Sequence, residues 1–345
     1  MILPGDRPES IAAAVSALAR GELVGLPTET VYGLACDACN DAAVARIFAA
    51  KGRPNDHPLI VHVATAAAVS RFARAVPPFA QALMDAFWPG PLTLILPRLP
   101  AVGAACAGGQ DSIGLRCPSH PVAQALLQSC WGAGIVGLAA PSANQFGRIS
   151  PTTAAHVQAE LGEGLLILEG GACSVGIEST IIDCTRGVPV LLRPGILTRA
   201  QLEVACQCTV RERDALVQGT TVPRASGTLE SHYAPKARLR LMDAKALLTA
   251  VTLLGTELHA APGGRAMVAL YSRVPLDNPV PGLLERRMPG DAVSTARELF
   301  AVLRELDAQG VKLIWVESPP PGPEWDGVRD RLQRAASPAL VKLTG

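Results

Sequence analysis

Apolar and polar positions alternate in two different periods over roughly the first two hundred residues. Ile11, Val15 and Leu18 recur at the spacing of one helix face, with Ser10 placed to cap that helix. Val44, Ile47 and Phe48 have the same spacing, and further helices are predicted over 120–130, 152–161 and 198–206. Short apolar runs, which have the length of buried strands, occur at 23–26, 59–63, 92–96, 113–116, 135–140, 165–168, 177–183 and 188–192. This mixture predicts an α/β domain with a mixed sheet over residues 1–210.

The alternation of predicted helices and strands stops over residues 211–237. The stretch is polar, contains Pro223 and Pro235, and has no sustained periodicity, so its composition predicts a linker. Beyond it, strands at 238–242, 266–271 and 311–316 alternate with helices at 244–258, 292–308 and 324–335. Such alternation predicts a small parallel sheet in a Rossmann-like α/β domain over 238–345.

Composition and charge narrow the class of protein. Hydrophobic residues make up 49% of the chain and charged residues 18%, which is typical of a globular protein. The formal net charge is +1. A protein that binds nucleic acid through many phosphate contacts usually has a clear excess of Lys and Arg, which this chain lacks. The first thirty residues lack a signal-peptide pattern, and no apolar run is long enough to span a bilayer. We therefore expect a soluble, cytoplasmic protein with no membrane partner.

The nine cysteines do not form a recognisable metal-binding pattern. Cys36 and Cys39 have C-x-x-C spacing, but a zinc site needs a second pair at matching spacing, and Cys206 and Cys208 are separated by one residue. The spacing favours reduced thiols that act as small buried hydrophobic residues. No metal site built from protein side chains is predicted.

Two polar clusters follow the first predicted strands. Thr28, Glu29 and Thr30 come directly after a strand, where they either bind a polar substrate or serve as turn and cap residues. Lys51 and Arg53 flank a glycine at a helix end. They either complement the helix dipole or clamp a phosphate, Lys as a point charge and Arg as a planar fork.

Further polar positions lie in or after later strands. Arg116 is on a predicted buried strand and needs an anionic partner, either an internal one such as Asp111 or Glu178 or a ligand. Ser142 and Asn144 follow another strand, where small polar residues suit an anion or a turn. The chain has no P-loop and no kinase signature set, so any nucleotide would be bound in another way.

Taken in order along the chain, these clusters resemble the YrdC family in its two-domain form, the L-threonylcarbamoyladenylate synthases. The resemblance runs from about residue 8 to the C-terminus. It is carried by T-E-T-V-Y-G-L, K-G-R-P-x-x-x-P-L-I-V-H, P-G-P-L-T, R-C-P-x-H-P, A-P-S-A-N, G-I-E-S-T-I-I-D, L-R-P-G and, in the linker, S-G-T-L-E-S-H-Y-A-P. The implied fold is a twisted mixed YrdC-like sheet with helices, followed by the linker and the smaller domain.

The resemblance implies a site in the first domain, with residues 211–237 as a lid over it. Lys51 and Arg53 would be catalytic. L-threonine would be bound by Thr30, His62, Arg116, Ala140 and Ser179. ATP would be bound by Lys51, Arg53, His57, Ser112, Ser142, Asn144, Ser150, Arg193 and, from the linker, Tyr233.

The implied activity is that of a nucleotidyltransferase, which converts ATP, L-threonine and bicarbonate into threonylcarbamoyl-AMP and pyrophosphate for tRNA modification next to the anticodon. Mg²⁺ would assist. The implied partner is a downstream tRNA threonylcarbamoyltransferase, and weak direct contact with tRNA is left open. Two alternatives are an RNA-binding module, disfavoured by the balanced charge and an aromatic content of 4%, and an enzyme that handles carbamoyl-adenylate.

Overall fold

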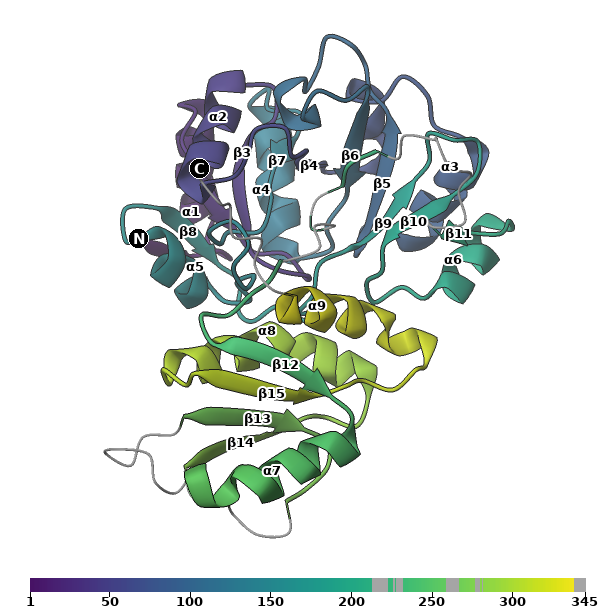
Figure 1. Cartoon of the computed structure of the whole chain (residues 1–345). Helices are drawn as coiled ribbons and strands as arrows, with labels where there is room; N and C mark the ends of the chain where they lie inside the picture. The colour runs from purple at the N-terminus through teal and green to yellow at the C-terminus, as the bar shows by residue number, and fades with distance from the viewer. Residues whose placement is uncertain are drawn as a thin grey trace, which may run out of the picture. The chain divides into compact units, whose positions relative to one another are not determined.

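The computed structural model describes residues 1–212, 223–225, 227, 232–258, 267–276, 280 and 282–337, with the backbone alone at 254–258. The chain divides into two compact units (Figure 1). Unit 1 comprises Met1–Phe146 and Ser150–Thr228, and unit 2 comprises Gly147–Ile149 and Leu229–Gly345. In the described part, no helix is long and apolar enough to cross a membrane.

The described residues of unit 1 form a mixed sheet of eleven strands in the order β1-β8-β2-β3-β7-β4-β6-β5-β9-β10-β11. The mixed sheet confirms the predicted class. Its strands are β1 Ile2–Pro4, β2 Val24–Leu26, β3 Gly33–Asp37, β4 Ile60–His62, β5 Leu92–Pro97, β6 Ser112–Arg116, β7 Leu138–Ala139, β8 Leu166–Glu169, β9 Thr180–Asp183, β10 Val190–Arg193 and β11 Arg211–Glu212.

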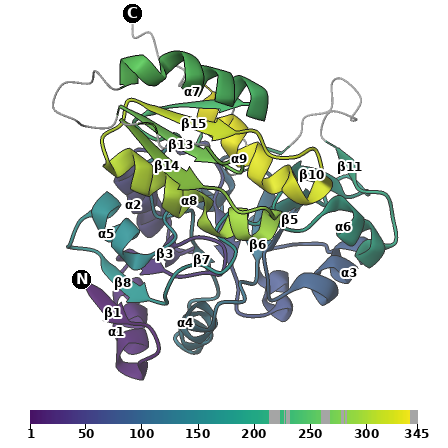
Figure 2. The ribbon, with the colours of Figure 1, turned by 90° about the horizontal axis from the view of Figure 1, so that it is seen from below.

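The two faces of this sheet bury different apolar clusters. In β3, Leu34 and Cys36 belong to one cluster and Ala35 to the other, as expected for a strand whose side chains alternate between faces. Helices α1 and α4 lie side by side over the cluster with Ala35, while α3 pairs with α6 (Figure 2). The helices are α1 Pro8–Ala19, α2 Asp41–Lys51, α3 Pro78–Phe87, α4 Pro121–Gly132, α5 Ala154–Leu161 and α6 Arg199–Cys206, with short 3₁₀ turns at Ala66–Arg71 and Ala105–Ala107.

Local signals predicted α2 better than α1. Helix α2 begins after Asn40, whose side chain accepts a hydrogen bond from the backbone of Ala43, and it ends at Gly52 in the left-handed conformation. The prediction that Ser10 caps α1 is wrong. The helix already begins at Pro8, whose fixed φ suits the first helical position, and Ser10 is buried inside it. Strands β1 and β3 and helix α3 were not predicted.

Unit 2 is a four-stranded parallel sheet in the order β12-β15-β13-β14, which confirms the predicted parallel arrangement. Helix α7 covers one face, and α8 and α9 cover the other (Figure 1). Strand β14 was not predicted because its sequence, LLERR, lacks an apolar run. The elements are β12 Arg238–Met242, α7 Ala244–Leu258, β13 Val268–Ser272, β14 Leu283–Arg287, α8 Ala292–Ala308, β15 Leu313–Glu317 and α9 Asp326–Ala336, with a 3₁₀ turn at Pro323–Trp325.

Candidate functional site

Strand register places polar side chains from four strands of unit 1 in one row. His62 on β4 pairs with Arg116 on β6, and the antiparallel register of β5 and β6 places Thr93 opposite Arg116. Thr93 pairs with Ile181 on β9, which pairs with Arg193 on β10. Because paired residues on neighbouring strands point to the same face of a sheet, these side chains share one face.

Arg116 stands at the centre of this row and is 4% exposed. Its Nη2 lies 2.6 Å from a carboxylate oxygen of Glu29, and its Nη1 donates to the Thr30 hydroxyl at 2.7 Å. Its Nε donates to the carbonyl of Gly90 at 3.3 Å. The guanidinium is therefore held in one orientation by two loops, those that follow β2 and precede β5.

His62 is a neutral buried imidazole beside that guanidinium. Burial, and secondly the charge of Arg116, lowers the pKa of His62 to about 3. Its Nδ1 is buried and has no hydrogen-bond partner among the described residues.

Lys51, the last residue of α2, is 2% exposed. Its Nζ donates to the carbonyls of Ser142 and Asn144, both at 2.5 Å, in the loop that follows β7. Burial, and secondly the charge of Arg53, lowers the pKa of Lys51 to about 7, against the opposing effect of Glu160 and Glu178.

Arg53 and His57 both pack against the ring of Phe146. The Arg53 guanidinium lies 5.8 Å from the ring centroid and donates from Nη2 to the carbonyl of Pro58 at 2.9 Å. The His57 ring lies 5.4 Å from the same centroid in an edge-on arrangement. Burial, and secondly Arg53, lowers the pKa of His57. Arg53 and His57 thus lie in one cluster around Phe146.

A hydroxyl network connects the end of β10 to β5 and β9. Arg193 Nη2 donates to the carbonyl of Ser179 at 2.9 Å and to its hydroxyl at 3.2 Å. The hydroxyls of Ser179 and Thr93 are 2.7 Å apart. Ser150 donates to the carboxylate of Glu178 at 2.5 Å. These contacts bring together candidates that are far apart in the sequence.

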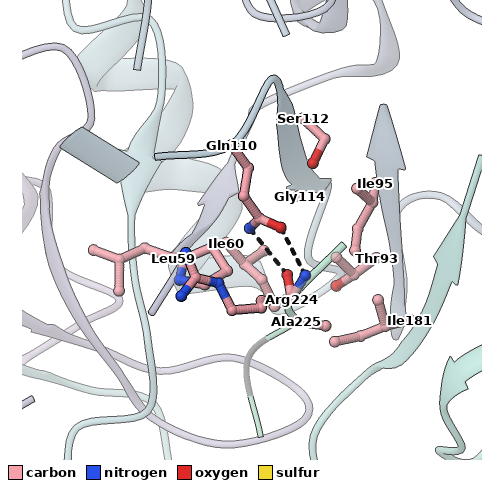
Figure 3. Close-up of a pocket in the computed structure, with 11 residues that line it drawn as sticks. Leu59, Ile60, Thr93, Ile95, Gln110, Ser112, Gly114, Ile181, Arg224 and Ala225 are labelled. Carbon is pink, nitrogen blue, oxygen red and sulfur yellow. Dashed lines mark hydrogen bonds between the residues drawn. The ribbon is translucent and has the colours of Figure 1, made fainter. Parts of the chain in front are cut away.

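A small cavity of about 10 Å³ lies on the sheet beside this row, between strands β4, β6, β5 and β9 (Figure 3). The side-chain amide of Gln110 exchanges two hydrogen bonds with the backbone of Arg224, at 2.7 and 3.2 Å. Arg224 also pairs with Asp56 at 2.7 Å. The cavity is lined by Pro58, Leu59, Ile60, Thr93, Ile95, Gln110, Ser112, Gly114, Ile181, Arg224 and Ala225. Of the predicted ATP ligands, it contains Ser112.

All the predicted site residues except one belong to unit 1, and Ala140 directly follows β7. Tyr233 belongs to unit 2, where it is buried 5.3 Å from the ring of Phe300, with the Arg331 guanidinium 5.4 Å from its own ring.

Of the C-x-x-C pair, Cys36 is buried as expected, whereas Cys39 is exposed. In the part of the chain that the structure describes, no group of three or more His, Cys, Asp or Glu residues could hold a metal ion.

Sequence reasoning missed one pairing and one candidate residue. The internal partner of Arg116 is Glu29, and the suggestions of Asp111 and Glu178 were wrong. Thr93 was not singled out either. Both residues lie inside the motifs T-E-T-V-Y-G-L and P-G-P-L-T, so the motifs were a usable signal.

Unit 1 buries several positively charged side chains of the predicted site. Lys51, Arg53, Arg116 and Arg193 are each less than 10% exposed, and the carboxylates of Glu29 and Glu178 are buried near them. Burying cations in such numbers is costly unless anions compensate them. The arrangement therefore suits a ligand with several negative charges, and rigid hydroxyl and guanidinium groups nearby suit a small polar molecule.

Two protein-family models match the chain. The model Sua5_yciO_yrdC, described as telomere recombination, matches residues 16–195. The model described as the C-terminal domain of threonylcarbamoyl-AMP synthase matches residues 197–337.

Similar proteins share these domains. A threonylcarbamoyl-AMP synthase of Pyrococcus abyssi is 37% identical over 96% of this chain and 96% of its own length. One of Bacillus subtilis is 41% identical over 68% of this chain and 66% of its own length. A crystal structure of P. abyssi Sua5 complexed with L-threonine superposes with a TM-score of 0.84 at 35% identity, covering 97% of each chain.

Proposed function

Because the chain belongs to the Sua5/YciO/YrdC family, in the two-domain form that carries the threonylcarbamoyl-AMP synthase C-terminal domain, we propose that it makes threonylcarbamoyl-AMP. The substrates are ATP, L-threonine and bicarbonate, and the products are threonylcarbamoyl-AMP, pyrophosphate and water. The enzyme is of the nucleotidyltransferase type, and its product serves tRNA modification. The observation that carries the proposal is the row of buried polar side chains around Arg116, in a fold shared with a relative that was crystallised with L-threonine.

In this proposal the row binds the amino acid. The guanidinium of Arg116 pairs with the threonine carboxylate, since Arg presents a planar fork of donors to carboxylates. Neutral His62, with a buried Nδ1 that has no partner among the described residues, is suited to exchange a hydrogen bond with the substrate hydroxyl. The full proposed set is Thr30, His62, Arg116, Ala140 and Ser179.

The cations at the end of α2 and β10 bind the nucleotide. Lys51 and Arg53 act on the phosphates, where they stabilise the charge that develops as pyrophosphate leaves. Arg193, at the end of β10, contributes a further positive charge to the nucleotide site. The full proposed set is Lys51, Arg53, His57, Ser112, Ser142, Asn144, Ser150, Arg193 and Tyr233.

The reaction requires the protein to position the substrates, and no side chain has to become covalently attached to them. The threonine amine adds to the carbon of bicarbonate, which loses water to give a carbamate. A carbamate oxygen then forms a bond to the α-phosphorus of ATP, and the bond between that phosphorus and the bridging oxygen breaks to release pyrophosphate. The residues of unit 1 hold the reacting atoms together and exclude water. Mg²⁺, bound through the phosphates of ATP, would neutralise part of their charge.

The organisation of the chain follows from this assignment. We propose residues 1–210 as the catalytic domain, 211–237 as a lid and 238–345 as a domain that anchors the lid; positions 213–222, 226 and 228–231 of the proposed lid lie outside the described residues. The labile mixed anhydride is handed to a downstream tRNA threonylcarbamoyltransferase.

The proposal is tested by measuring pyrophosphate release from ATP with and without L-threonine and bicarbonate. We expect release to require both. Carbamoyl phosphate in place of bicarbonate and threonine is the comparison that separates this activity from carbamoyl-adenylate chemistry. Release that ignores threonine, or that needs carbamoyl phosphate, would refute the assignment.

A further inference from the structure

Two cysteine thiols of unit 1 lie against each other where α6 ends. The Cys208 thiol donates a hydrogen bond to the sulfur of Cys206, and the two sulfur atoms are 3.3 Å apart. The Cys206 thiol donates to the carbonyl of Cys208 at 3.5 Å. The described residues include all nine cysteines, every one of them a free thiol, and no other two of these sulfur atoms share a hydrogen bond there.

The backbone between the two cysteines favours this contact. Gln207 follows the last residue of α6 in the left-handed conformation, with φ 51° and ψ 34°. A residue in this conformation curls the chain, so its two neighbours lie closer together than they would along an extended backbone. Cysteines joined by a disulfide usually have Cα atoms about 4.4–6.8 Å apart, which requires such closeness. We therefore expect a bond between these sulfur atoms to need side-chain rotation and no movement of α6.

The two thiols differ in their access to solvent. Cys206 is 8% exposed and belongs to the apolar cluster that contains Leu34. Cys208 is half-buried and packs at the edge of the same cluster. A water-soluble oxidant can therefore reach Cys208 more readily, while Cys206 is positioned to react with the oxidised sulfur.

We propose that Cys206 and Cys208 form a modification site, a dithiol that a peroxide oxidises to a disulfide. In the first step the thiolate sulfur of Cys208 attacks one peroxide oxygen. An S–O bond forms, the O–O bond breaks, and the other oxygen leaves as hydroxide, which takes up a proton to give water. In the second step the thiolate sulfur of Cys206 attacks the sulfur of Cys208. The S–S bond forms, the S–O bond breaks, and a second hydroxide leaves and becomes water. The two sulfur atoms together lose two electrons, which reduce one peroxide molecule.

The position of the pair indicates a reversible modification and not a structural cross-link. The bond closes a very short loop, so it restricts the unfolded chain less than a bond between distant residues would. Burial, and secondly the hydrogen bond with Cys206, raises the pKa of Cys208 to about 11. Little thiolate is therefore present near neutral pH, and oxidation needs an excess of peroxide. Neither cysteine belongs to the proposed substrate site, so the modification does not depend on the proposed function.

Peptide mass spectrometry tests the proposal directly. Trypsin cleaves after Arg199 and after Arg211, so both cysteines fall in one peptide, residues 200–211. The folded full chain is treated with excess hydrogen peroxide at pH 8, unfolded in N-ethylmaleimide and digested. We expect this peptide to have lost two hydrogen atoms and to carry no maleimide. Treatment with dithiothreitol before the maleimide should restore two thiols that can be alkylated.

The tryptic peptide of residues 21–46 is the internal control, because it contains the C-x-x-C pair Cys36 and Cys39. The Cys36 thiol donates to the carbonyl of Asp37 at 3.5 Å, away from any partner sulfur. In the folded chain the disulfide should form about tenfold faster in peptide 200–211 than in peptide 21–46, because proximity accelerates ring closure.

Unfolding the chain in guanidinium before the peroxide is added should abolish this preference, since the contact at the end of α6 is then lost. Two intact thiols in residues 200–211 of the folded, peroxide-treated chain would overturn the proposal. The same preference in the unfolded chain would also overturn it, because the native contact would then have no part in the reaction.

Discussion

At the scale of single residues, the account depends most on the buried cations at the end of α2. Lys51→Ala and Arg53→Ala should each lower threonine-dependent pyrophosphate release on the order of a hundredfold or more, because in the proposed site each removes a positive charge that binds the phosphates. Lys245→Ala, on the surface of α7 in unit 2, should leave the rate unchanged. Circular dichroism checks that the fold is intact. Wild-type turnover in both variants would remove the phosphate-binding assignment.

The protonation of Lys51 gives a second prediction at this scale. Burial places its pKa at about 7, so at pH 8 most free protein carries a neutral Lys51. Bound phosphate raises that pKa, because an opposite charge favours the protonated amine. ATP binding should therefore take up nearly one proton at pH 8, and affinity for ATP should fall as the pH rises above about 7.

Calorimetry at pH 8 in Tris and in HEPES, two buffers with different ionisation enthalpies, measures that uptake. Lys51→Met, which keeps the apolar stem, should abolish it. Equal binding enthalpies in the two buffers for the wild-type chain would contradict the lowered pKa or the contact with phosphate.

At the scale of elements, the end of β10 is positioned by a close approach to β9. A Cβ atom added to Gly195 would lie 2.6 Å from both the backbone nitrogen and the hydroxyl of Thr180. Gly195→Ala should therefore displace the segment that follows Arg193, cost about 1–3 kcal/mol of unfolding free energy, and weaken ATP binding. Chemical denaturation measures the first effect.

Gly164→Ala provides the comparison, since nothing lies within 4 Å of the Cβ position there. It should leave both stability and ATP binding close to those of the wild-type chain. If Gly195→Ala behaves like Gly164→Ala, the packing of this loop does not position Arg193.

Elements with strong local signals could be predicted from the sequence. Helix α2 has an asparagine cap and a terminal glycine, and each long apolar run contains a strand. Strand β3 was not predicted, because Gly33–Asp37 begins inside the motif T-E-T-V-Y-G-L, whose polar residues were interpreted as a possible substrate site. Strand β7 is shorter than its apolar run, since Leu138–Ala139 alone pair with neighbouring strands.

The candidate site was predictable as a set of motifs but not as a set of contacts. Thr30 and Arg116 are 86 positions apart, and only strand register brings them to 2.7 Å. The pairing of Glu29 with Arg116 has the same origin, and no spacing in the sequence encodes it. Burial decides the protonation of Lys51 and His62, which depends on neighbours contributed by several elements.

At the scale of the whole molecule, both units match the two-domain relatives, and the central claim concerns what the complete chain makes. The most direct measurement is mass spectrometry of a reaction that contains the full chain, ATP, L-threonine, ¹³C-bicarbonate and Mg²⁺. The account predicts an adenylate that contains threonine and one carbon derived from the labelled bicarbonate, and no such product when threonine is left out. Consumption of ATP without a threonine-containing, labelled adenylate would contradict it.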